Sequence, residues 1–280
     1  MTGKKLSIEE VMQLASKALI AHNTNEQIAR TVAEALVNAE AEGQQGHGLA
    51  RLPSYCAQAL SGKVDGHAKP QTVHEATAAF RIDARHGFAY PALDLARQRL
   101  IELTPKTGIG VASVFNSHHC GVAGHQVEAL ARQGLVALLF SNTPKAIAPW
   151  GGKKAVFGTN PIAFASPGGL GDDPIVVDLS LSKVARGKIM FADQEGQDIP
   201  EGWALDEHGN PTTNPKAALN GTMLPLGEAK GAALVFMSEI LASALTGSNI
   251  SFEASSFFTA EGSPPGTGQL LIAFDPGPLS

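Results

Sequence analysis

The amino-acid sequence predicts an α/β fold with a helical N-terminal part. Apolar residues recur at helical spacing through the first 61 positions. After Gly108, short apolar strand patterns alternate with helical segments, as in layered α/β domains. The chain has 280 residues, of which 44% are hydrophobic and 17% are charged, so it can bury a large core.

The N-terminal helices are predicted from their start signals. Ser7 and Glu10 form a capping-box pattern ahead of a first helix. The stretch 24–27, which begins at Thr24, repeats that pattern and opens a longer helix that should fade near Gly43. Pro53 at a first helical position predicts a third, short helix.

The remaining elements follow from the spacing of apolar residues. Residues 62–77 are polar and broken by Gly and Pro, which predicts a linker. The predicted strands are 79–83, 109–115, 135–140, 162–165, 175–179 and 269–274. The predicted helices are 90–103, 124–133 and 229–245, the last apolar enough for burial on several sides.

Composition and missing motifs exclude several classes of protein. The net charge of −5 disfavours a nucleic-acid or anionic-membrane partner, and no apolar window is long enough to span a membrane. Cys56 and Cys120 are too few for a disulfide scaffold and fit a reducing cytoplasm. No Rossmann G-x-G-x-x-G, P-loop or G-x-S-x-G motif is present.

The stretch from Gly46 to Arg51 is the most informative. If it is helical, His47 and Arg51 lie on one face with Cβ atoms about 5–6 Å apart. A guanidinium matches a carboxylate, and an imidazole titrates near neutrality, so the pair could bind an acid and move a proton. A solvated helix end is the alternative.

Residues 117–125 form the densest polar cluster. Adjacent side chains cannot easily aim at one ion and no C-x-x-C pair is present, so we expect no metal site. The cluster joins a strand to a helix, and Gly121 and Gly124 would let a ligand approach closely. Free N–H groups at the helix start would then bind a phosphate, unless this is an ordinary turn.

These segments, with further polar turns, resemble the malate/L-lactate dehydrogenase family that is unrelated to the Rossmann enzymes. That family also contains sulfolactate dehydrogenases and cyclic imino acid reductases. The resemblance covers nearly the whole chain. It rests on 46–48 with Arg51, 117–119, 157–161, 177–180, 199–204, 226–231 and 245–247.

The resemblance implies a mixed, non-Rossmann sheet that binds NADP or NAD, a small 2-oxo or imino acid substrate, and a homodimer. It implies His47 as the proton donor, and Arg51, Thr159, Arg186 and Gly187 as substrate-binding residues. The implied nucleotide contacts are His119, Cys120, Gly121, Val122, Ala123, Asp178, Leu179, Ser180 and Glu228. The resemblance implies three parts of the chain. Residues 1–72 form a helical substrate and dimer domain, residues 73–225 form the nucleotide-binding α/β domain, and residues 226–280 form a C-terminal helix and strand that return to the first domain.

The sequence departs from the family pattern at two places. Some members, including imine reductases, pair the histidine with a preceding serine and with an aspartate after Arg-Gly. Gly46 and Lys188 stand there, so no Ser–His–Asp relay is expected. Members usually carry a further tail with an Arg-x-Pro-Gly segment. The expectation is either a truncation after Ser280 or a naturally short variant. A truncation should bind nucleotide weakly and tend to associate.

The leading expectation is hydride transfer between NAD(P) and a small 2-hydroxy acid of the malate, lactate or sulfolactate type. One alternative is a reductase of pyrroline- or piperideine-2-carboxylate. An alternative of another class is a catalytically silent paralogue that only dimerises or binds nucleotide. The sequence leaves NAD against NADP open, because no acidic ribose-reading fingerprint applies to this fold.

Overall fold

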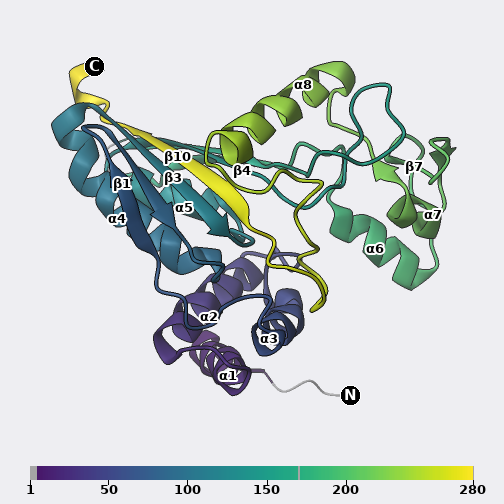
Figure 1. The fold of residues 1–280 in the computed structure, drawn as a ribbon, viewed down its shortest axis with the longest axis horizontal. Helices are drawn as coiled ribbons and strands as arrows, with labels where there is room; N and C mark the ends of the chain where they lie inside the picture. The colour runs from purple at the N-terminus through teal and green to yellow at the C-terminus, as the bar shows by residue number, and fades with distance from the viewer. Residues whose placement is uncertain (1–4, 170, 280) are drawn as a thin grey trace.

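The computed structural model describes residues 5–169 and 171–279, and the predicted α/β class is confirmed. Three N-terminal helices lie at one end of a mixed seven-stranded sheet, and a smaller lobe lies at the other side (Figure 1). In the described residues, no helix is both long enough and apolar enough to cross a membrane.

The N-terminal helices begin where local caps place them. They are α1 (Ile8–Ala21), α2 (Glu26–Ala41) and α3 (Leu52–Ser61), with the short 3₁₀ helix η1 (Leu49–Arg51) before α3. The Ser7–Glu10 capping box is confirmed. The second predicted box is wrong: the Asn25 side chain accepts the first N–H groups of α2, while Thr24 is buried.

The main sheet has the strand order β1-β2-β3-β10-β4-β5-β6. β2 and β3 are parallel, and every other neighbouring pair is antiparallel. The strands are β1 (Gln71–Glu75), β2 (Ala79–Asp83), β3 (Ile109–Ser117), β4 (Val136–Ser141), β5 (Ile162–Ser166), β6 (Ile175–Leu179) and β10 (Thr267–Phe274). All predicted strands are confirmed with small shifts at their ends, and β1 lies inside the predicted linker.

Helices cover both faces of this sheet. Leu271 and Ala273 of β10 belong to the core under α4 (Ala89–Thr107) and α5 (Ala123–Ala131). Leu270, in contrast, packs with Ala242 on the opposite face, which lies under α8 (Glu228–Glu239) and its π-helical extension η2 (Ile240–Ala244). Because alternate residues of a strand point to opposite faces, the last strand serves both cores.

β6 is an edge strand with a neighbour only on the β5 side, and its apolar side chains are exposed. The prediction that the helix 229–245 is buried on several sides is wrong. α8 buries only one face, and the side chains of Phe236 and Met237 are exposed. The apolar character of these segments therefore did not predict which face of each element the rest of the fold covers.

The smaller lobe was not predicted. It contains α6 (Arg186–Glu195), α7 (Pro215–Asn220) and a three-stranded sheet of β7 (Ala204–Leu205), β8 (Pro211–Thr212) and β9 (Thr222–Met223). Ile147, Leu181 and Ile189 lie in its core. The short 3₁₀ helix η3 (Gly277–Leu279) follows β10.

Candidate active site

His47 lies in a turn, not on a helix. Residues 45–48 form turns after α2, and Arg51 ends η1, so the prediction that both lie on one helical face is wrong. The turn is held from α2, where the Glu40 carboxylate accepts the N–H of Leu49 at 2.9 Å. Glycine is needed here because a Cβ on Gly48 would lie 3.0 Å from the Glu40 backbone.

Replacing Gly48 by alanine should therefore destabilise the turn. We expect a loss of about 1–3 kcal/mol in the free energy of unfolding, since the added methyl must displace the α2 backbone. Denaturant titration measures this loss. Gly46→Ala is the control, because a Cβ there meets nothing within 4 Å. Equal stability of the two variants would contradict the role given to Gly48.

The structure brings His47 and His119 together. Their rings stack with centroids 5.2 Å apart and planes 13° from parallel. The Tyr55 hydroxyl lies 2.7 Å from His119 Nδ1 and 3.3 Å from the Tyr90 hydroxyl, and both tyrosines are buried. Tyr55 thus anchors the ring against which His47 stacks.

Three buried polar atoms of this cluster have no partner among the described residues: His47 Nδ1, Arg51 Nη1 and His118 Nδ1. The His118 ring is packed against the rings of Tyr55, Phe88 and Phe257, so the first two atoms are the candidates for a ligand. Arg51 is otherwise held, because its Nε donates to the Gly46 carbonyl at 2.7 Å and its guanidinium lies 4.2 Å from the centre of the Phe258 ring. An unpaired buried polar atom costs about 1–3 kcal/mol, so these two atoms indicate a site for a polar ligand.

The histidines of the site are electrically neutral at neutral pH. Burial, together with the charges of Arg51 and His125, lowers the pKa of His47 to about 4. Burial lowers the pKa of His118 to about 3, and that of His119 well below its usual value. Arg51 is therefore the cation of this cluster, although burial also lowers its pKa.

The segment from His119 to Ala123 runs from these histidines to the start of α5. Gly121 has φ of +70° and packs on Tyr90. At the helix start, the Asp178 carboxylate accepts the N–H of Gly124 at 2.7 Å. The prediction of free N–H groups for a phosphate is wrong at Gly124, because a carboxylate already occupies that donor. Burial raises the pKa of Asp178, and the Gly124 N–H opposes that shift.

Backbone hydrogen bonds of Leu181 join the segments that carry other predicted site residues. Its N–H donates to the Thr159 carbonyl at 2.8 Å, and its carbonyl accepts from Leu226 at 3.0 Å. Leu179 of β6 pairs with Ile162 of β5. Residues 178–180, at the end of β6, therefore lie beside Thr159, which comes just before β5. Glu228 begins α8 just beyond Leu226, with φ of +58°, and is exposed.

Arg186 and Gly187 lie at the start of α6. Arg186 is partly buried and donates to the Leu219 carbonyl at 3.2 Å. Within the described residues, no hydrogen bond, ion pair or ring contact joins Arg186, Gly187 or Glu228 to His47. Gly46 and Lys188 are both exposed, and His47 Nδ1 has no partner among the described residues, so His47 is in no Ser–His–Asp relay.

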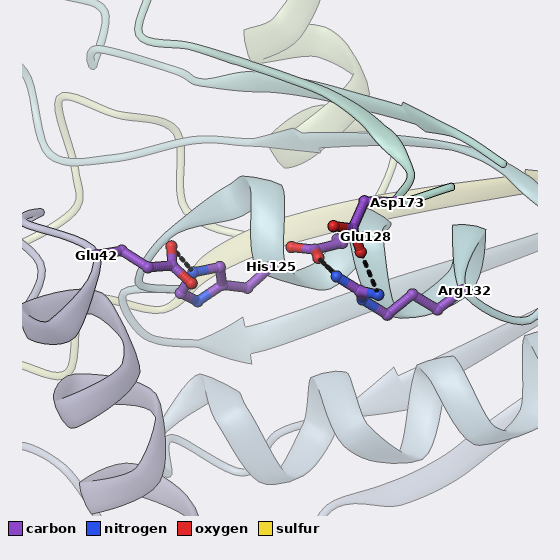
Figure 2. Close-up of polar contacts among 5 residues, drawn as sticks. All are labelled: Glu42, His125, Glu128, Arg132 and Asp173. Carbon is purple, nitrogen blue, oxygen red and sulfur yellow. Dashed lines mark hydrogen bonds and ion pairs between the residues drawn. The ribbon is translucent and has the colours of Figure 1, made fainter. Parts of the chain in front are cut away.

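A hydrogen bond that the sequence did not predict joins the N-terminal helices to the sheet domain. His125 Nε2 lies 2.7 Å from a Glu42 carboxylate oxygen, which links the end of α2 to α5 (Figure 2). At the far end of α5, Arg132 pairs with Glu128 and Asp173. In the described residues, no group of three potential ligands could hold a metal ion.

The comparison with known families decides the identity. The family model for malate/L-lactate dehydrogenase matches residues 6–280. The chain belongs to the malate/L-lactate dehydrogenase family. The predicted resemblance is thereby confirmed, as is the prediction of an NAD(P)-dependent dehydrogenase of this family.

Relatives in this family cover nearly the whole chain. It is 52% identical to the (2R)-3-sulfolactate dehydrogenase (NADP(+)) of Chromohalobacter salexigens, over 99% of this chain and 83% of that protein. It is 42% identical to the Δ1-pyrroline-2-carboxylate/Δ1-piperideine-2-carboxylate reductase of Pseudomonas putida, over 99% and 81%. The Δ1-piperideine-2-carboxylate reductase structure from Pseudomonas syringae superposes with a TM-score of 0.92 at 40% identity, over 98% and 82%.

Proposed function

We propose that this chain oxidises and reduces a small 2-hydroxy acid/2-oxo acid pair of the sulfolactate type, with NADP as the preferred cofactor. The observation that carries the proposal is the pair of unpartnered buried atoms, His47 Nδ1 and Arg51 Nη1. Identity of 52% to an NADP-dependent sulfolactate dehydrogenase, against 42% to an imino acid reductase, supports this acid class.

The roles of the two residues follow from their chemistry. Arg51 binds the carboxylate of the acid, and this fixes the orientation of carbon 2. His47 gives a proton to the oxygen on carbon 2 during reduction and takes it back during oxidation. A carboxylate bound at Arg51 would offset a charge that lowers the pKa of His47, so binding of the acid favours protonation of the imidazole.

The proposed nucleotide residues include acceptors for ribose hydroxyls. The carboxylate of Asp178 is an acceptor for sugar hydroxyls, and it already holds the α5 N-terminus. Ser180 adds a hydroxyl directly after the end of β6. When bound, the nicotinamide supplies or accepts the hydride. The segment 119–123, Leu179 and Glu228 complete the proposed nucleotide contacts, and Thr159, Arg186 and Gly187 are proposed to line the substrate.

The pH dependence of the two directions should differ. Reduction needs protonated His47, and its fraction in the enzyme without acid falls about tenfold per pH unit above a pKa of about 4. We expect kcat/KM for reduction to fall with that slope between about pH 5 and 8. Oxidation needs neutral His47, so its kcat/KM should stay level over the same range. A level reduction profile up to pH 7 would contradict the assignment.

A panel assay tests the proposed reaction. NADH and NADPH oxidation is measured with 2-oxo acids, including the oxo form of sulfolactate, and with pyrroline- and piperideine-2-carboxylate. We expect turnover with the 2-oxo acids and a preference for NADPH. Turnover only with the cyclic imines would replace the proposal by an imino acid reductase, and no turnover would favour a silent paralogue.

The proposal includes a homodimer in the cytoplasm. Exposed apolar side chains on β6 and α8, such as Val177 and Phe236, offer surface for a second copy. Cys56 and Cys120 are free thiols, as suits a reducing compartment. Sizing with light scattering tests the dimer, and a monomer at assay concentration would remove it from the proposal.

A further inference from the structure

Residues 252–261, here called the phenylalanine loop, connect distant parts of the molecule. After α8 and η2 the chain descends toward α3, where this loop lies, and then returns to β10 (Figure 1). Side chains from α3 and the residues after it hold its backbone. Gln58 Nε2 donates to the Phe257 carbonyl at 2.8 Å, and the Ser61 hydroxyl donates to the Ala260 carbonyl at 3.0 Å.

Lys63 makes the strongest of these attachments. Its ammonium group donates to the carbonyl oxygens of Ser256, Thr259 and Glu261 at 2.7, 2.9 and 2.8 Å. Lys63 is only 3% exposed, so these carbonyls replace its water shell. Hydrogen bonds from a charged donor are stronger than neutral ones, and three of them fix the curvature of the loop.

The loop presents two aromatic rings to the candidate site. The buried Phe257 ring lies 5.0 Å from the His118 ring and 5.2 Å from the His119 ring. Phe258 lies under the Arg51 guanidinium, 4.2 Å from ring centre to Cζ, and is 41% exposed. No residue of this loop was predicted as part of the site.

Arg51 is therefore restrained in two directions. The bond from Nε to the Gly46 carbonyl fixes one edge of the guanidinium, and the Phe258 ring fixes its plane. Nη1 remains buried without a partner among the described residues. A planar fork binds a carboxylate well only when its plane and free edge are held in the right direction.

We infer that Phe258 is a positioning residue for Arg51, and that Lys63 positions Phe258 by clamping the phenylalanine loop. The inference rests on the proposed role of Arg51 as the carboxylate clamp. Phe258 acts here through Arg51 and not on the reacting atoms. Its loss should therefore weaken binding of the acid and leave the chemical step nearly unchanged.

The test compares Phe258→Leu with Phe252→Leu in the full chain. Phe252 is on the same loop and is 51% exposed, so it is a matched control. We expect Phe258→Leu to raise the KM for the 2-oxo acid about tenfold with kcat within about threefold, as fits loss of a cation–π contact. Phe258→Tyr should restore the KM, because it keeps the ring. An unchanged KM in Phe258→Leu would overturn the inference.

A second pair of variants tests the clamp. Lys63→Met removes all three donors, and Lys69→Met changes an exposed lysine in the same region. We expect Lys63→Met to raise the KM and to speed amide hydrogen exchange in residues 252–261, while the unfolding midpoint of the rest of the chain is retained. Unchanged exchange in the loop would overturn the role of Lys63.

Arg51→Lys separates this inference from the proposed function. If Arg51→Lys leaves the KM for the acid unchanged, the carboxylate role itself fails. If Arg51→Lys raises the KM and Phe258→Leu does not, only the positioning role of Phe258 fails. If neither the parent nor Arg51→Lys binds any acid of the panel, the proposed function fails. Hydrogen exchange in Lys63→Met still tests whether Lys63 clamps the phenylalanine loop.

Discussion

Replacing His47 by alanine should lower kcat by about 10²–10⁴-fold while nucleotide binding stays nearly intact. The expected loss is that of a general acid–base group, because the His47 imidazole is placed to move the proton at the oxygen on carbon 2. Nucleotide binding should persist, since the proposed contacts at 178–180 are not part of the His47 turn, and the Tyr55 hydroxyl still holds His119 when the stacked ring is lost. Steady-state kinetics and titration of nicotinamide fluorescence measure the two effects.

The control for this variant is His67→Ala, because His67 is exposed and far from the stacked histidines in sequence. It should have parent-like kinetics. If His47→Ala kept a near-normal kcat with a 2-oxo acid, another group would have to move the proton. His119, which stacks on His47, would then be the first residue to test.

Replacing Arg51 by lysine should raise the KM for the acid by about 10²-fold. An ammonium is a point charge and cannot reproduce the planar fork, nor the contact with the Phe258 ring. Loss of one partner of a buried hydrogen-bonded charge pair typically costs about 2–5 kcal/mol. The KM is measured with the acid and with its amide, which lacks the charge.

The amide should bind the parent enzyme poorly, because it lacks the charge that Arg51 would bind. The KM for the amide should therefore change much less than the KM for the acid when Arg51 is replaced by lysine. Arg30→Lys serves as the control, because Arg30 forms an exposed ion pair on α2. Equal KM values for the acid in the parent and in Arg51→Lys would remove Arg51 from the carboxylate site.

Local signals predicted much of the fold. The Ser7 capping box and the strand at 79–83 depend on neighbouring residues, and both are confirmed. β1 was missed because it is a polar edge strand, held by pairing with β2 and not by its own apolar pattern. α6 was missed because only Ile189 is buried along it, which leaves almost no helical periodicity to detect.

The candidate site was predicted only in part, because its geometry is non-local. His47 and Arg51 were singled out from one short stretch, although the helix assumed there is absent. Tyr55 follows Arg51 by four residues, a spacing that could have drawn attention to it. Lys63 and Phe258 lie far apart in the chain. Nothing local in either segment shows that the fold brings the loop carbonyls to Lys63 and the Phe258 ring to Arg51.

The proposed chemistry is tested most directly by oxidation of (2R)-3-sulfolactate with NADP⁺. Nicotinamide absorbance is followed for the parent chain and for His47→Ala at equal concentration. We predict steady NADPH formation by the parent, slower formation with NAD⁺, and a loss of about 10²-fold or more in the variant. No reduction of either nucleotide by the parent, or equal rates for parent and variant, would contradict the assignment of His47 and Arg51 as a 2-hydroxy acid site.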